Sequence, residues 1–295
     1  EEALASVYEQ TAAFPFEVVV YDDCSEDDTL AKARGVSSHS DIPTRFMCME
    51  QNQFRLGRTL LLIIEREARG RYLARLDADD FWCSPTKLQR QVELLEAHPD
   101  VPLAATASRA VDTYGTALDN GVPRQDVLAA APLVPGTALA GGNFLSHSST
   151  VIRLSALRKP IPAGWEELRA RDYALWSILT ATGRVGFLPE IMTAIRLHSA
   201  NSWMGKPLAE RQLDEFLATL WLAQATDSPA REIWAQRSRD LFSYTQSLVA
   251  EQAEQTGALR AQVEALEERA RAGEERARAG EERARAGERA AHRAE

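Results

Sequence analysis

The segment RYLARLDADDFWCSPTK, residues 71–87, carries the pattern that decides the fold. Its first six residues fit a strand, and three carboxylates follow within four positions, at Asp77, Asp79 and Asp80. Ser84 and Pro85 then favour the start of a helix, because Ser is a preferred N-cap and Pro fits the first helical position. A strand that ends in polar residues and leads into a helix is typical of α/β folds, whose ligands bind at the carboxyl ends of the strands.

The same alternation continues on both sides of this segment. A helix opens the chain, and the further expected elements are strands over 17–21, 45–50 and 101–108 and helices over 25–34, 56–68 and 84–95. Alternating strands and helices with short connections predict a mixed, mostly parallel sheet flanked by helices. Polar residues again follow the strands, with Asp22 and Asp23 after the first and Asn52 after the second.

The second half of the chain is expected to be less regular. Residues 113–143 are rich in Gly, Pro and Ala and predict a long irregular connection. The elements expected after it are a strand over 149–153, a helix over 172–182, two short extended pieces within 185–197 and two amphipathic helices within 208–250. We therefore expect three parts, namely a main domain over 1–205, a helical extension over 206–255 and a charged low-complexity segment over 256–295.

The charged segment repeats the heptad EERARAG from Glu267, Glu274 and Glu281. Each Glu precedes an Arg by four residues, a spacing that stabilises helices, and a seven-residue period is typical of coiled coils. The heptad positions that would face a partner helix, however, include Gly273 and Gly280, which weaken a helix and bury no side chain. A solvated helix and an oligomerising coiled coil both remain open.

Bulk composition excludes several classes of protein. The net charge of −9 argues against a general nucleic-acid binder, which needs a basic surface. Three scattered cysteines without a C-x-x-C pair favour reduced thiols over a disulfide framework or a zinc site. No apolar run approaches the length of a membrane helix. We expect a cytoplasmic chain; peripheral membrane contact through the helices after Leu208 is the alternative, although no basic amphipathic face supports it.

The acidic turn at residues 77–80 has two interpretations. Hard carboxylate oxygens suit Mg²⁺ or Mn²⁺, with Asp77 and Asp79 reaching one side of the turn and Asp80 pointing elsewhere. The alternative is a solvated acidic turn that caps the following helix. At the first strand end, Asp22 and Asp23 are candidates for contacts with a nucleobase or ribose, whereas residues 25–28 fit a helix cap.

Three segments in succession resemble the motifs of the inverting glycosyltransferase family 2, which has the GT-A fold. They are FPFEVVVYDDCSEDDT (residues 14–29), EQNQFRLGRT (50–59) and GRYLARLDADDFWCSPTKLQRQVELLEAHPD (70–100). Looser matches follow at HSSTV (147–151), RDYALW (171–176) and IRLH (195–198), so the resemblance is dense to about residue 110 and loose to about 200. The family's first strand would precede Glu1, and we expect it to be missing here together with part of the donor pocket.

The resemblance implies an inverting transfer of a sugar from a nucleotide-diphosphate donor, such as a UDP-sugar, to a saccharide or lipid-linked acceptor. It implies Mn²⁺ or Mg²⁺ as cofactor and, by analogy, a role in surface-polysaccharide assembly. The implied residues are Asp22, Asp23, Asn52, Arg58, Asp77 and Asp79 for the nucleotide-sugar, Asp79, Asp80 and His198 for the metal, and Asp172 for the catalytic base.

Three alternatives stay open beside this interpretation. Asp172 also fits a helix-start residue paired with Arg169 or Arg171, and His198 also fits a packed or surface histidine. The whole chain also fits a catalytically inactive, transferase-like scaffold with an oligomerising tail. A metal-dependent phosphohydrolase or nucleotidyltransferase would leave Asp172 and the segment Pro85–Leu88 unexplained.

Overall fold

The computed structural model describes residues 1–56, 64, 66–118, 124–198, 206–227, 230–251, 253, 254 and 257. The chain divides into two compact units, Glu1–Phe242 and Ser243–Glu295. In the second unit, residues 243–251, 253 and 254 are helical. The EERARAG repeats lie outside the described residues, so the choice between a solvated helix and a coiled coil stays a prediction.

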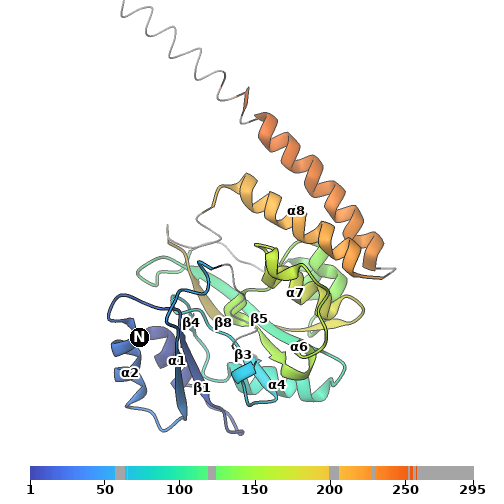
Figure 1. The fold of residues 1–295 in the computed structure, drawn as a ribbon. Helices are drawn as coiled ribbons and strands as arrows, with labels where there is room; N and C mark the ends of the chain where they lie inside the picture. Colours follow the sequence, from blue (N-terminus) through green and yellow to red (C-terminus); the bar gives the residue numbers. More distant parts are fainter. Residues whose placement is uncertain are drawn as a thin grey trace, which may run out of the picture. The chain divides into compact units, whose positions relative to one another are not determined.

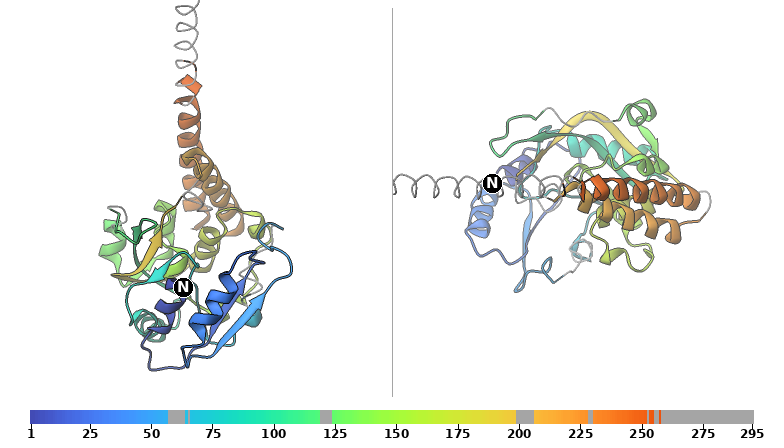
Figure 2. Two further views of the ribbon diagram at one scale, coloured as in Figure 1. Left: turned by 90° about the vertical axis from the view of Figure 1, so that its left-hand side faces the viewer. Right: turned by 90° about the horizontal axis from the view of Figure 1, so that it is seen from above.

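The first unit begins with two helices and two parallel strands. They are α1 (Glu2–Tyr8), β1 (Val18–Asp22), α2 (Thr29–Ser37) and β2 (Thr44–Cys48). β1 and β2 pair in register from Val18 with Thr44 to Asp22 with Cys48. α2 lies beside this pair (Figure 2), and its Arg34 guanidinium sits 4.5 Å from the ring centroid of Phe46. Both predicted strands are confirmed, whereas α2 continues past Gly35, where the sequence pattern ended it.

A second sheet forms the centre of the unit (Figure 1). Its strands run in the order β3 (Tyr72–Ala74), β7 (Val151–Arg153), β5 (Leu103–Val111), β8 (Arg184–Arg196) and β4 (Phe81–Trp82), with β6 (Leu133–Pro135) also paired to β8. The long β5–β8 pairing is parallel, like β1–β2, and the shorter pairings are antiparallel. The expected mixed α/β class is confirmed.

β8 is one strand, so the prediction of two short extended pieces is wrong. Its register with β5 jumps from Thr106 opposite Leu188 to Ala107 opposite Ile191. The two residues that bulge out are Pro189 and Glu190. A bulge is one of the few places in a sheet that tolerate proline, which has no N–H for the ladder. The strand therefore continues across a residue that locally resembles a break.

The helices that cover this sheet are α4 (Lys87–Ala97), α5 (Gln125–Ala130), α6 (Leu154–Leu157), α7 (Arg171–Thr180) and α8 (Leu208–Ala225), and residues 230–242 are also helical. Short 3₁₀ turns form at η1 (Gly136–Gly141), η2 (His147–Ser149) and η3 (Trp165–Glu167). α4 takes Thr86 as its N-cap, two residues after the predicted Ser84. The stretch 113–143 is more regular than predicted, since α5, β6 and η1 all lie within it.

Two apolar clusters stabilise the unit. The larger one lies between β5, β8, α7 and α8 and includes three tryptophans that are at most 2% exposed, Trp165, Trp176 and Trp234. The smaller one joins α4 to β4 and β5 through Leu95, Trp82 and Ala104. No helix in the described part of the chain has the length and apolar character that crossing a bilayer requires. This packed second sheet thus positions the loops that follow β3 and β5.

Candidate active site

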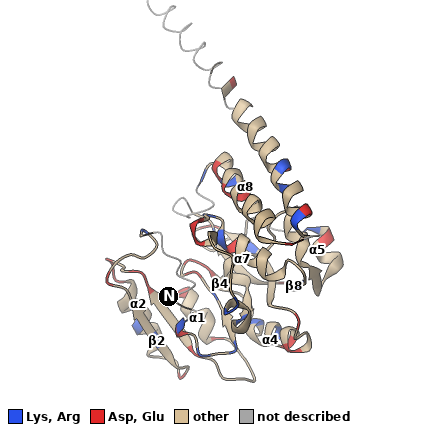
Figure 3. Cartoon of the chain, turned by 45° about the vertical axis from the view of Figure 1, so that its right-hand side comes forward, with Lys and Arg blue, Asp and Glu red and all other residues tan. Residues whose placement is uncertain are grey.

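The acidic turn after β3 gathers its three carboxylates in one place. Asp77, Asp79 and Asp80 each offer an oxygen, and these oxygens lie within 4.8 Å of one another. The backbone N–H of Asp80 donates to the carbonyl of Asp77 at 3.1 Å, which folds the turn back on itself. The expectation that Asp80 points elsewhere is therefore wrong, because the turn is tight rather than extended. Figure 3 marks acidic residues, in red, along the loops beside β4 and near the start of the chain.

Asp80 is the buried member of this group, at 5% exposure. The Ser148 hydroxyl donates to its Oδ2 at 2.6 Å, and the backbone N–H of Arg196 donates to its Oδ1 at 2.9 Å. Burial raises the pKa of Asp80 to about 6, and the charges of Asp79 and Asp77 add to the rise. These conditions disfavour the ionised carboxylate in the chain alone, and a cation beside it would relieve that cost.

Ser148 fixes both ends of the acidic turn. Its hydroxyl, which donates to Asp80, also accepts from the backbone N–H of Asp77 at 3.1 Å. Its carbonyl accepts from the indole N–H of Trp82 at 2.9 Å. Ser148 is fully buried in η2, so a single side chain sets the spacing between the two outer aspartates.

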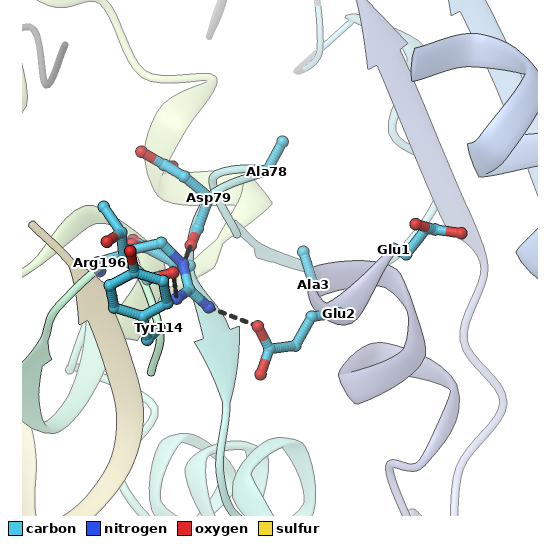
Figure 4. A pocket seen from close by; sticks show the side chains of 9 residues that line it. Glu1, Glu2, Ala3, Ala78, Asp79, Tyr114 and Arg196 are labelled. Atoms are coloured by element: carbon cyan, nitrogen blue, oxygen red, sulfur yellow. Dashed lines mark hydrogen bonds and ion pairs between the residues drawn. The ribbon is translucent and has the colours of Figure 1, made fainter. Parts of the chain in front are cut away.

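Arg196, at the end of β8, holds the other side of the turn. Its Nε donates to the carbonyl of Asp79 at 3.0 Å, and its Nη1 donates to the carbonyls of Asp112 and Thr113 at 3.1 and 3.0 Å. Nη2 forms an ion pair with Glu2 (Figure 4). The guanidinium thus contacts protein oxygens of the acidic turn, of residues 112 and 113 and of Glu2.

His198 also reaches this group, with its Nε2 at 3.0 Å from Asp79 Oδ2. The structure therefore brings together four residues that the sequence singled out, Asp77, Asp79, Asp80 and His198. Carboxylate and imidazole ligands in such a cluster suit Mn²⁺ or Mg²⁺. The metal interpretation of the turn gains support over the solvated cap, although which atoms coordinate stays a prediction.

Asp172 lies at the start of α7, where the side chains of Arg75 and His147 approach it. Arg75 Nη1 lies 2.9 Å from its Oδ1, and His147 Nδ1 lies 2.9 Å from its Oδ2. Burial alone would raise the pKa of Asp172, but His147 and Arg75 outweigh it and hold that pKa well below its usual range. The carboxylate is therefore ionised and oriented.

His147 connects Asp172 to the acidic turn. Its Nε2 lies 3.7 Å from Asp77 Oδ1, while its Nδ1 contacts Asp172. Neither Arg75 nor His147 was singled out from the sequence as a site residue. The only signal was their position inside motif segments, Arg75 just before the acidic turn and His147 at the start of HSSTV.

The carboxyl end of β1 is built differently. Both oxygens of Asp23 accept backbone N–H groups, from Gln53 at 2.7 Å and from Phe54 at 2.9 Å. Asn52 Nδ2 donates to the carbonyl of Asp23 at 2.9 Å. Asp22 is buried and accepts from the backbone N–H of Ser25 at 3.4 Å. Asp23 and Asn52 thus shape the loop 50–56, and their contact with a nucleotide stays a prediction. The candidate Arg58 lies outside the described residues.

An open pocket of about 330 Å³ lies beside the acidic turn (Figure 4). Its lining residues are Glu1, Glu2, Ala3, Ala78, Asp79, Asp80, Thr113, Tyr114 and Arg196. The pocket is mostly polar, and Tyr114 supplies its aromatic surface. The arrangement offers a cation site on one side and room for a polar ligand next to it.

Sequence comparisons place the chain among glycosyltransferases. Residues 1–147 match the model of Glycosyl transferase family 2. An uncharacterized protein of Mycobacterium tuberculosis is 29% identical over 207 residues, which are 68% of this chain and 56% of that protein. The amylovoran biosynthesis glycosyltransferase AmsE of Erwinia amylovora is 28% identical over 204 residues, 68% of this chain and 71% of AmsE. The chain thus spans little more than half the length of the mycobacterial relative.

Solved structures share the fold at low sequence identity. TarS 1-349 of S. aureus, in complex with UDP, superposes with a TM-score of 0.58 and 20% identity over 82% of this chain and 66% of that chain. The mannosyltransferase PcManGT from Pyrobaculum calidifontis, in complex with GDP-Man and Mn²⁺, gives a TM-score of 0.58 and 18% identity over 85% and 74%. The motifs occur in the order of the family, the family model matches residues 1–147, and these solved structures share the architecture. The chain therefore belongs to glycosyl transferase family 2 and has the GT-A fold.

Proposed function

We propose that the chain transfers a sugar from a nucleotide-diphosphate donor to a hydroxyl acceptor, with inversion, in a single displacement. The observation that carries this proposal is the placement of Asp172. A carboxylate held ionised by Arg75 and His147 lies one side chain away from the cluster of Asp77, Asp79 and Asp80. A base beside a cation site is the minimum that such a displacement requires.

The residues of the acidic turn fit a divalent cation. Three carboxylate oxygens within 4.8 Å and a buried Asp80 whose pKa is raised to about 6 form a site of unbalanced negative charge. Hard oxygen donors suit Mn²⁺ or Mg²⁺. When bound there, the ion would supply positive charge to the diphosphate as it leaves. Ser148 and Arg196 would keep Asp80 in place through their hydrogen bonds.

Asp172 would accept the proton of the acceptor hydroxyl as that oxygen attacks the anomeric carbon. Each of its oxygens holds one hydrogen bond, and a carboxylate oxygen has a second lone pair for another. Arg75 and His147 orient the carboxylate through these two contacts. One base suffices, because inversion in one step needs no second catalytic carboxylate, unlike glycoside hydrolysis.

We propose a UDP-sugar as the donor, with Asp22, Asp23, Asn52 and Arg58 toward the nucleoside. The structural relative TarS was solved with UDP and another with GDP-Man, which makes both nucleotides suitable probes. The acceptor we propose is a saccharide or a lipid-linked saccharide, in line with the biosynthetic role in the name of AmsE. We further propose that residues 256–295 mediate self-association. The relatives named as glycosyltransferases give no support to an inactive scaffold.

Calorimetric titration of UDP, with and without Mn²⁺, tests the donor site. We expect binding that requires Mn²⁺ and disappears in the double variant Asp79→Asn, Asp80→Asn, while Asp41→Asn, at an exposed aspartate outside the site, binds normally. Asp172→Asn should bind UDP normally and lose transfer by about 10²–10⁴-fold, the range of general base catalysis. Metal-independent binding of UDP, or full transfer by Asp172→Asn, would refute the proposal.

A further inference from the structure

Tyr114 stands out among the residues that line the pocket. Its side chain is 92% exposed, whereas most aromatic rings of this chain pack against neighbours. A single aromatic residue exposed on an open surface needs no explanation. Tyr114, however, lies in the wall of a polar pocket beside Asp79, Asp80 and Arg196. Its exposure there calls for a reason.

The turn that carries Tyr114 is held by its own hydrogen bonds. Asp112 Oδ1 accepts the backbone N–H groups of Tyr114 and Thr116, both at 2.8 Å. The backbone N–H of Gly115 donates to the carbonyl of Asp112 at 3.1 Å, and Gly115 adopts a φ of +85°, which favours glycine. The N–H of Asp112 donates to the carbonyl of Thr116 at 2.9 Å, which closes the turn. The ring is therefore presented from a defined backbone conformation.

Arg196 ties this turn to the acidic cluster. Its Nη1 donates to the carbonyls of Asp112 and Thr113, directly before Tyr114. Its Nε donates to the carbonyl of Asp79, and its backbone N–H donates to Asp80. Figure 4 shows the Tyr114 ring beside Arg196 and Asp79. One residue thus sets the position of the exposed ring relative to the carboxylates.

We infer that Tyr114 is a stacking platform for a pyranose ring in the reaction. A pyranose has an apolar C–H face and a rim of hydroxyl groups. Tyrosine offers the apolar surface at little cost in conformational entropy, and the charged groups of the pocket offer hydrogen-bond partners for the rim. A ring of this kind belongs to the donor sugar or to the acceptor sugar. The inference rests on the proposed function, since it assumes that a sugar enters this site.

The donor arm of the test uses UDP and UDP-glucose, UDP-galactose and UDP-N-acetylglucosamine, each titrated with Mn²⁺ into the whole chain and into Tyr114→Ala and Tyr114→Phe. If Tyr114 stacks the donor sugar, Tyr114→Ala binds UDP like the unchanged chain and binds the preferred UDP-sugar roughly 3- to 10-fold more weakly. Tyr114→Phe keeps the ring and retains the affinity. Tyr244→Ala, at a half-exposed tyrosine of the second unit, serves as a matched control.

The acceptor arm measures UDP release from the preferred donor with water and with methyl glycosides as acceptors. If Tyr114 stacks the acceptor, Tyr114→Ala keeps donor affinity and hydrolysis, and its KM for the methyl glycoside rises by a similar factor. The inference is wrong if Tyr114→Ala behaves like the unsubstituted chain in both arms, or if it loses as much affinity for UDP as for the UDP-sugar. The proposed function would stand in either case. If the chain without substitutions binds no UDP, both the proposed function and this inference are wrong.

Discussion

The substitution Asp80→Asn should stabilise the fold while it removes cation binding. Asp80 is 5% exposed, and burial raises its pKa from 3.8 to about 6. The folded chain therefore binds this proton more tightly than the unfolded chain does. It follows that the ionised carboxylate destabilises the fold, that this cost is absent below pH 3.8, and that it is complete above pH 6.

The size of the effect follows from that pKa. Since a tenfold change in proton affinity corresponds to about 1.4 kcal/mol, the carboxylate costs about 3 kcal/mol at pH 8, about 1.6 kcal/mol at pH 5 and under about 1 kcal/mol at pH 4. An asparagine side chain resembles the protonated acid, accepting from the Arg196 N–H and donating to the Ser148 oxygen. Asp80→Asn should thus unfold with a free energy about 3 kcal/mol higher at pH 8, or at a temperature about 6–12 °C higher.

Urea unfolding in EDTA from pH 4 to pH 8, followed by tryptophan fluorescence, measures this difference. Saturating Mn²⁺ should then stabilise the unchanged chain, by about 2.7 kcal/mol at 100 times the dissociation constant, and leave Asp80→Asn unaffected. Asp41→Asn should show neither effect. Two results would refute this argument: an Asp80→Asn variant that is less stable than the unsubstituted chain at pH 8, or a difference in unfolding free energy that does not vary with pH. Either would show that the ionised Asp80 carboxylate does not destabilise the fold in the absence of a cation.

Three further substitutions test other parts of the site. Arg75→Gln should raise the pKa of Asp172 and so move the acidic limb of the pH profile of kcat to higher pH. It should also lower the free energy of unfolding by about 1–3 kcal/mol. An acidic limb that does not move would contradict the pairing of Arg75 with Asp172. Asp23→Ala should weaken UDP binding about tenfold and speed amide exchange in the loop 50–56, because two loop N–H groups lose their acceptor; unchanged exchange would contradict this. Burial lowers the pKa of Lys87 to about 7, so stability should rise from pH 7 to pH 10.5 in the unchanged chain, and Lys87→Met should flatten that rise in unfolding measurements.

The strands of the first half could be predicted because their signals are local. A run such as 17–21 is apolar and β-branched and is followed by charged residues, so β1 (Val18–Asp22) appears within one residue of its predicted place. Helix starts are less certain, since neighbouring residues compete for the cap. Ser84 and Thr86 both suit that position, and the structure uses Thr86.

The stretch 113–143 shows what local patterns miss. β6 is three residues long and contains Pro135, so it carries almost no strand signal of its own. It forms because Leu133 and Val134 pair with Gly186 and Val185 of β8, about fifty residues later. Short strands of this kind exist only in the context of the partner that supplies their hydrogen bonds. No window of sequence around Leu133 contains that information.

The candidate site divides in the same way. The acidic turn is a local feature and could be predicted, whereas the residues that hold Asp172 come from 97 and 25 positions away, at Arg75 and His147. The second of these is followed by Ser148, which holds Asp80. Adjacent residues of one 3₁₀ turn therefore fix the proposed base and the proposed cation ligand. Because a shift of this turn would move both Asp172 and Asp80, a substitution that displaces it should impair, under the proposed mechanism, both proton transfer and the departure of the leaving group.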